Sequence, residues 1–178
     1  MSQPSIEVIT PKDSDYPPLL KQIPRYPKQL YIRGDIKLLQ HPHLLAVVGS
    51  RRANAYGKQS MNLLLPPVVE AGAVLVSGLA YGIDSLAHQI CVEAGRPTIA
   101  VLGGGIDDKT IYPVANRKLA AKILKTGGAI ISEYEPGTPA RPGQFPARNR
   151  IVAALCQATL VVQAATKSGS LITARLAL

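Results

Sequence analysis

The chain has 178 residues, of which 47% are hydrophobic, and its 20 lysines and arginines outnumber its 11 aspartates and glutamates, giving a formal net charge of +9. This length and composition exclude a disordered chain and predict one globular domain with a sizeable core. The positive charge favours a polyanionic partner such as nucleic acid, with a generally basic surface as the alternative.

Several absences narrow the class of protein further. Cys91 and Cys156 are the only cysteines, and their wide spacing fits neither a disulfide framework nor a zinc motif, so we expect no metal site. Without a secretory signal or an apolar run of about 18 residues, we expect a cytoplasmic protein that does not contact a membrane. One Phe, seven Tyr and no Trp are too few for an extended base-stacking platform, although one or two stacked bases remain compatible with them.

The first segment, residues 1–43, is rich in proline and charge and predicts an N-terminal extension that packs beside the main domain, with a short strand at 29–33. From residue 44 onward, to residue 178, strand and helix patterns alternate. Strands are expected at 44–48, 73–76, 98–102, 129–131 and 159–163.

The first helix is expected at 56–65, with a break or kink at Pro66-Pro67 before a last turn at 68–70. A second helix is expected at 84–93, with Asp84 as its N-cap. Further helices are expected at 114–126, at 151–155 and from 170 onward, with an irregular loop over 136–146. This alternation predicts an α/β fold with a doubly wound, mostly parallel sheet.

Turns of small residues end three of the predicted strands: Gly49-Ser50-Arg51-Arg52, Ser77-Gly78-Leu79-Ala80 and Gly103-Gly104-Gly105. The carboxyl ends of parallel strands share one edge of a sheet, where ligands of α/β folds bind, so these turns are predicted to lie at one rim. Small residues let a ligand approach the backbone closely.

The Gly49–Arg52 turn is the first candidate for a phosphate site. It precedes a predicted helix, whose first N–H groups would attract an anion, and Ser50 and Arg51 can both hydrogen-bond to phosphate. The alternative is a connecting turn with two solvated arginines. Neither the dinucleotide fingerprint nor the G-x-x-x-x-G-K-[ST] phosphate loop occurs, so we expect no nucleotide cofactor.

A second cluster combines Phe145, Arg148 and Asn149 just before an apolar helix. Phe can stack a base, Arg can bind phosphate and Asn can read a base edge. The alternative is a buried Phe anchor with Arg148 paired to an acid such as Glu133. Further along, Ser168-Gly169-Ser170 offers hydroxyl and N–H groups at another helix start.

Asp84 and His88 are one helical turn apart. This spacing favours a structural hydrogen bond between them over a catalytic pair, because no third polar partner is visible for a triad.

In their order, these motifs resemble the DprA/Smf family of DNA-processing proteins over roughly residue 16 to the end. The matching segments are Val47–Arg51, Ser77–Asp84 with Ala87-His88, Ala100–Gly103, Tyr112-Pro113, Ser132-Glu133, Phe145–Arg150 and Ser168–Ala174. The resemblance implies a Rossmann-like domain that binds single-stranded DNA, protects incoming DNA and loads the RecA recombinase during natural transformation, without being an enzyme.

The residues expected to bind DNA come from the three turns and the two later segments: Gly49, Ser50, Arg51, Arg52, Ser77, Gly78, Gly103, Gly105, Phe145, Arg148, Asn149, Ser168, Gly169 and Ser170. In the family the domain continues past the Thr173-Ala174 helix into a further strand that contributes to self-association. We therefore expect the C-terminal part of the domain to be missing here and homodimer formation to depend on it.

Two sequence differences concern chemistry. The family often has an acid where this chain has Gln163. The family is also similar to phosphoribohydrolases of the lysine-decarboxylase-like group, which carry a catalytic Glu in a Thr-x-x-Glu motif. Here Thr173 is followed by Ala174, Arg175 and Leu176, so the acid is absent. A nucleotide-binding enzyme of that type is the alternative function.

Overall fold

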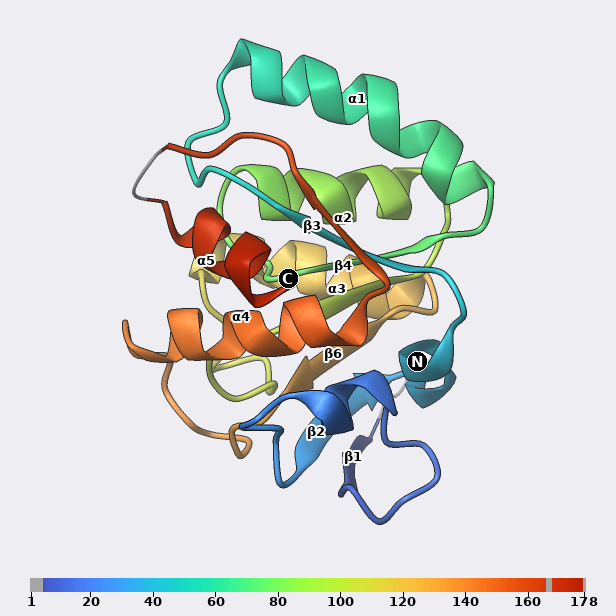
Figure 1. Cartoon of the computed structure of the whole chain (residues 1–178), viewed down its shortest axis with the longest axis vertical. Coiled ribbons are helices and arrows are strands. Elements are labelled where there is room, and N and C mark those ends of the chain that lie inside the picture. Colours follow the sequence, from blue (N-terminus) through green and yellow to red (C-terminus); the bar gives the residue numbers. More distant parts are fainter. Residues whose placement is uncertain (1–4, 166–167, 178) are drawn as a thin grey trace.

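The computed structural model describes residues 5–165 and 168–177, which form an α/β layered structure around one sheet (Figure 1). The sheet has seven strands in the order β1-β2-β6-β5-β4-β3-β7. Their bounds are β1 Ile6–Ile9, β2 Leu30–Gly34, β3 Leu44–Val48, β4 Val74–Ser77, β5 Thr98–Val101, β6 Ala129–Ser132 and β7 Ala158–Val161. Neighbouring strands from β6 to β7 are parallel, whereas β1 and β2 add an antiparallel edge. The predicted doubly wound, mostly parallel sheet is confirmed.

Five α-helices and three short 3-10 helices are present in the described part of the chain. Their bounds are η1 Leu19–Gln22, η2 Ile36–Gln40, α1 Ala55–Glu70, α2 Ile83–Glu93, η3 Val114–Asn116, α3 Arg117–Lys125, α4 Gln144–Leu155 and α5 Gly169–Leu176.

Alternate residues of each central strand face opposite layers. On β4, Val74 and Val76 pack with α4 and the N-terminal segment, whereas Leu75 packs with α1 and α2. On β5, Ala100 belongs to the cluster around α3. The two-residue period of a strand therefore produces two apolar layers, with α1, α2 and α3 on one face of the sheet and α4 on the other (Figure 1).

Helix α1 runs without a break through Pro66-Pro67 to Glu70, so residues 68–70 are not the separate last turn expected from the sequence. Met61, Leu65 and Val69 recur at four-residue spacing, and all three are fully buried or nearly so. The carbonyl groups that the two prolines cannot satisfy belong to residues 62 and 63, which are exposed to water. Burial of the apolar face therefore outweighs the cost of proline inside the helix.

Helix α4 starts at Gln144, inside the segment expected to be a loop, and it runs through Pro146. Proline is tolerated there because the first N–H groups of a helix have no intrahelical acceptor. The expected N-cap of α2 is also wrong, since Gly82 occupies that position and Asp84 lies in the first turn. The helix expected over 114–126 is divided into η3 and α3.

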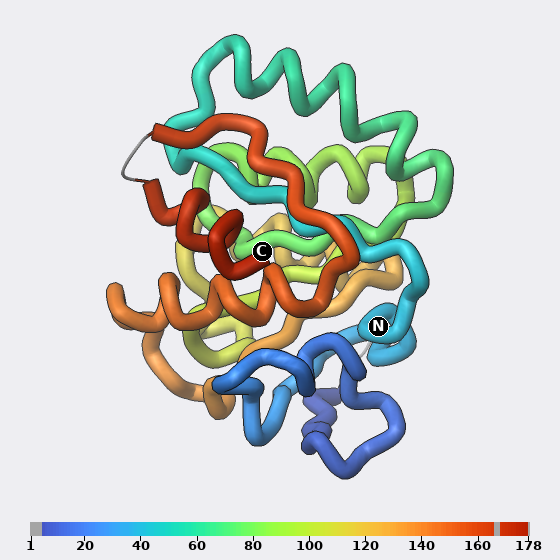
Figure 2. The backbone as a smooth tube through the Cα atoms, in the orientation of Figure 1, coloured from blue at the N-terminus to red at the C-terminus, as the bar shows by residue number. Residues whose placement is uncertain are grey.

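The last strand, β7, lies at one edge of the sheet, opposite to β1, and pairs in parallel with β3. Figure 2 shows the segment containing β7 running beside the segment that leaves β3. The contact is direct, because the N–H of Ser50 donates to the Gln163 carbonyl at 2.7 Å. No helix in the described residues is long and apolar enough to cross a membrane.

Candidate functional site

The three small-residue turns lie at one rim of the sheet, as predicted, because β3, β4 and β5 are parallel neighbours. Hydrogen bonds tie the turns together. The Ser77 hydroxyl donates to the Val47 carbonyl at 2.7 Å, and the N–H of Ile83 donates to the Ser50 carbonyl at 3.1 Å. The ends of β3 and β4 are therefore fixed relative to each other.

A cavity of about 290 Å³ opens at this rim, and we call it the rim cavity. Its walls come from the end of β3, the turn before α2, the first half of α4 and the start of α5. It is lined by Val48, Gly49, Ser50, Arg51, Ala80, Asp84, Phe145, Pro146, Arg148, Asn149, Ala165, Ser168, Gly169 and Ser170. Nine of the fourteen residues expected to bind DNA are in this set.

The Arg51 side chain is exposed at the mouth of the rim cavity. The turn that carries it is closed by the Ser50 hydroxyl, which accepts from the Arg52 N–H and lies 3.1 Å from the Arg52 carbonyl. Helix α1 begins at Ala55, three residues after Arg52 and close to the expected start at residue 56. Asn54 caps it by accepting from the Gly57 N–H at 2.9 Å, so the first N–H groups of α1 do not belong to the Arg51 turn.

Gln163 accepts hydrogen bonds from residues on both sides of the Arg51 turn. Its backbone carbonyl accepts from Ser50 and its side-chain oxygen accepts from the Asn54 N–H at 3.1 Å. Gln163 is therefore a neutral acceptor at both ends of the Arg51 turn.

Arg148 lies at the floor of the rim cavity and is only 4% exposed. Its guanidinium donates to the Gly78 carbonyl at 2.8 Å and to the Val101 carbonyl, at the carboxyl ends of β4 and β5. It does not pair with Glu133, as the alternative interpretation held. That acid instead forms a two-pronged ion pair with Arg150, at 2.6 and 2.7 Å.

Asp84 provides the negative charge near Arg148. Burial raises the pKa of the Asp84 carboxyl, and the positive charge of Arg148 opposes that shift. The Asp84 carboxylate also accepts from the N–H groups of Gly78 and Ala80 at 3.1 and 3.4 Å. Sequence reasoning missed Asp84 as a lining residue, although its position six residues after Gly78 is compatible with this local bridge.

The expected hydrogen bond between Asp84 and His88 is absent. His88 is fully buried, and its Nδ1 lies 2.9 Å from the Thr98 hydroxyl. That hydroxyl donates to the Leu75 carbonyl, so the hydrogen between Thr98 and the ring belongs to Nδ1. Burial, followed by the charge of Arg148, lowers the pKa of His88 to about 3. His88 is therefore a neutral core residue behind the site.

Ser168 and Asn149 also line the rim cavity and carry polar side chains that can hydrogen-bond to a ligand. The Ser168 hydroxyl is buried without a hydrogen-bond partner among the described residues. The Asn149 amide donates to the Gly169 carbonyl at 3.4 Å and accepts from Arg148 at 3.3 Å. The cavity thus combines an exposed guanidinium with an unsatisfied hydroxyl donor, which suits a phosphate group.

Phe145 stands between the rim cavity and the Gly103 turn. A Cβ at Gly103 would lie 3.1 Å from the ring, so glycine lets the ring pack against the turn. The Arg51 guanidinium carbon lies 5.5 Å from the centre of the Phe145 ring, in the range of a cation–π contact.

The remaining expected site residues lie elsewhere at the rim. Arg52 lines a separate open hollow beside α1 and α2. Ser77 is buried, and Gly78 lies under Arg148. Gly103 and Gly105 are buried, and the Gly105 N–H donates to the Thr138 carbonyl at 2.8 Å. No cluster of three or more metal-binding side chains occurs in the described ranges.

The family model and the similar proteins all point to one family of DNA-processing proteins. The family model for DNA recombination-mediator protein A matches residues 7–178. The chain is 42% identical over 179 residues to Protein Smf of Escherichia coli K12, covering 100% of this chain and 47% of that protein. It is 41% identical over 173 residues to DNA processing protein DprA of Bacillus subtilis 168, covering 97% of this chain and 57% of that protein. The chain thus spans about half the length of these curated relatives.

Two solved structures are also similar. The X-ray structure of DNA processing protein A from Streptococcus pneumoniae superposes with a TM-score of 0.88 at 39% identity, covering 97% of this chain and 59% of that one. DNA processing protein A from Helicobacter pylori, described for its single-stranded DNA binding mode, superposes with a TM-score of 0.85 at 36% identity, covering 99% of this chain and 78% of that one.

Proposed function

Because the chain belongs to the DNA recombination-mediator protein A family, the DprA/Smf proteins, we propose that it binds single-stranded DNA at the rim cavity. The observation that carries this proposal is that one cavity is lined both by the exposed Arg51 guanidinium and by the buried Ser168 hydroxyl, which has no hydrogen-bond partner among the described residues. A guanidinium and a hydroxyl that converge on one cavity suit a phosphate.

The preference for a single strand follows from what lies beside the phosphate position. Phe145 adjoins the rim cavity and carries Arg51 over its ring. The faces of bases are available to aromatic side chains in a single strand but are covered by their neighbours in a duplex. The Helicobacter pylori relative, whose description names single-stranded DNA, supports the same choice.

A direct titration tests the proposal. Fluorescein-labelled oligo-dT should bind more tightly than a duplex of equal length, and the logarithm of the affinity should fall with the logarithm of salt concentration by about 0.7 for each phosphate contact. Tighter binding of the duplex, or an affinity that does not change with salt, would contradict the proposal.

The proposed role is non-enzymatic. The alternative, a hydrolase of nucleoside monophosphates, requires a carboxylate acid or nucleophile. Helix α5 supplies none after Thr173, and the carboxylate that does line the rim cavity, Asp84, already accepts two backbone N–H groups next to Arg148. We expect no release of adenine from AMP. Release above background that is lost in Asp84→Asn would establish the enzymatic alternative instead.

The family's description as recombination mediators supports a further step, in which the bound strand is passed to a RecA-type recombinase during transformation. Homodimer formation is expected to depend on the C-terminal part of the domain that follows the Thr173-Ala174 helix in the family. Sedimentation of the protein alone tests homodimer formation. Strand-exchange assays test recombinase loading: added protein should shorten the lag before exchange on single-stranded DNA that is already coated with a single-strand-binding protein.

A further inference from the structure

A second, smaller hollow adjoins the rim cavity. It has a volume of about 40 Å³ and is lined by Arg51, Gly78, Ala80, Tyr81, Tyr112, Pro113, Phe145 and Arg148. Both spaces are lined by Arg51, Ala80, Phe145 and Arg148, so they share a common wall. A chain of nucleotides that places a phosphate by Arg51 therefore has its neighbouring base within reach of the smaller hollow.

The aromatic rings around this hollow differ in what they can offer a ligand. Phe145 is partly buried and contacts the Gly103 turn, Arg51 and Tyr112. Tyr112 is 50% exposed and Tyr81 is 48% exposed. The Tyr112 and Phe145 ring centres are 5.7 Å apart at an interplanar angle of 38°, so the two rings pack against each other. The free aromatic surface at the rim therefore belongs to the tyrosines.

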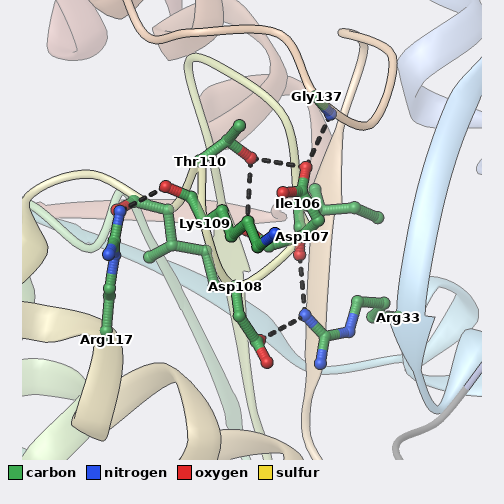
Figure 3. Close-up of polar contacts among 9 residues, drawn as sticks. Arg33, Ile106, Asp107, Asp108, Lys109, Thr110, Arg117 and Gly137 are labelled. Atoms are coloured by element: carbon green, nitrogen blue, oxygen red, sulfur yellow. Dashed lines mark hydrogen bonds and ion pairs between the residues drawn. The ribbon is translucent and has the colours of Figure 1, made fainter.

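The loop that leads to Tyr112 is anchored on one side by β2. The Arg33 guanidinium, which is 4% exposed, donates to the Ile106 carbonyl at 2.9 Å and to the Asp108 carboxylate at 2.8 Å (Figure 3). The buried arginine therefore fixes the start of the loop to the sheet edge.

The same loop is anchored on its other side as well. The Asp107 carboxylate accepts from the Thr110 hydroxyl and from the Gly137 N–H, both at 2.6 Å, and Arg117 donates to the carbonyls of Lys109 and Ile111 (Figure 3).

Tyr112 itself lies between Ile111 and Pro113, which are both buried. An exposed ring on a backbone held from three directions is pre-organised for contact with a ligand.

We propose that Tyr112 is a base-stacking residue, which takes one nucleobase of a single strand against its exposed face while Tyr81 flanks the same base. This inference rests on the proposed function of the rim cavity. The smaller hollow is too small to enclose a base, so the base lies across it without hydrogen-bond readout of its edges. Stacking of this kind accepts any base, and it adds an interaction that the phosphate site alone does not make.

The test compares two oligonucleotides that carry the same phosphates, oligo-dT and an abasic strand of equal length. Tyr112→Ala should weaken oligo-dT binding by about 5- to 150-fold, the range for loss of one stacked base. Its affinity for the abasic strand and its salt dependence should match those of the wild-type protein. Tyr112→Phe should retain oligo-dT binding. Tyr56→Ala is the matched control, because Tyr56 is 69% exposed on α1 and lines neither the rim cavity nor the smaller hollow.

Other outcomes separate this inference from the proposed function. If Tyr112→Ala binds oligo-dT as the wild-type protein does, or weakens binding of both strands equally, the stacking role is wrong while the phosphate site stands. If the wild-type protein binds neither strand, the proposed function fails and the stacking role fails with it. An unchanged unfolding midpoint for Tyr112→Ala shows that a loss of affinity does not come from unfolding.

Discussion

The Arg148 guanidinium lies directly against Gly78, so closely that a Cβ atom at position 78 would overlap its terminal nitrogens. The same guanidinium donates to the Gly78 carbonyl at 2.8 Å. Absence of a side chain at the end of β4 is therefore what lets an arginine of α4 reach the floor of the rim cavity and connect the two elements.

Gly78→Ala is expected to displace Arg148 and to lower the free energy of unfolding by about 1–3 kcal/mol, the usual cost of overpacking a filled interior. Urea denaturation followed by circular dichroism measures the change. Gly169→Ala is the control, because a Cβ at that position would meet no atom within 4 Å. Equal stability of Gly78→Ala and the wild-type protein would mean that Arg148 has room to move.

The His88 ring makes stability depend on pH. Burial, followed by the charge of Arg148, lowers its pKa to about 3 from 6.5, so the unfolded chain binds a proton that the folded protein excludes between these values. The free energy of unfolding should therefore decrease as pH falls from about 6.5 towards 3, by up to about 1.4 kcal/mol per pH unit from this residue.

The measurement is a series of urea denaturation curves between pH 7 and pH 4 for the wild-type protein and His88→Gln. Other groups titrate in both proteins, so the difference between the two isolates His88. A variant that loses stability as steeply as the wild-type protein would show that His88 titrates normally in the folded state.

Helix α1 carries an avoidable cost at Pro67, which is exposed and has no N–H to donate to the residue 63 carbonyl. Pro67→Ala restores that hydrogen bond and places a better helix former in α1, which stabilises the folded protein. The substitution also gives the unfolded chain more conformational entropy, which opposes this gain by about 1 kcal/mol. We expect a net stabilisation of about 1–2 kcal/mol, measured as a higher thermal midpoint. A lower midpoint would indicate that the ring of Pro67 contributes packing that outweighs the restored bond.

The arrangement of the central strands could be predicted because local pattern and fold agree there. Apolar runs that end in small residues specify strand ends, and parallel pairing then brings the turns to one rim. The start of α4 could not be predicted in this way, because Pro146 is a helix breaker in most positions and is harmless only in the first turn, which the sequence does not mark.

The sequence predicted which residues line the candidate site better than it predicted what each of them does there. Arg51 and Arg148 have the same chemistry in the sequence, yet one is exposed at the mouth and the other is buried at the floor. That difference depends on carbonyl groups 70 and 47 residues away from Arg148, at Gly78 and Val101. Such acceptors are recognisable only once the strands are assembled.

Arg51 provides the sharpest test of the phosphate role. Its guanidinium lines the rim cavity, so Arg51→Ala should weaken binding of oligo-dT by about 1–3 kcal/mol, as expected for a charge-assisted hydrogen bond. The loss should be the same for every base composition, because phosphate contacts carry no sequence information. The salt dependence should become shallower by about 0.7, because the variant neutralises one phosphate fewer than the wild-type protein does.

Lys122→Ala is the matched control, since it removes one positive charge from the exposed face of α3, outside the rim cavity. A uniformly basic surface would attract DNA through either side chain, and the two variants would then lose affinity equally. A localised phosphate site predicts a loss for Arg51→Ala and a nearly unchanged affinity for Lys122→Ala, measured by fluorescence anisotropy at the same salt concentration. Equal losses in two folded variants would overturn the assignment of Arg51, because only the total charge would then matter.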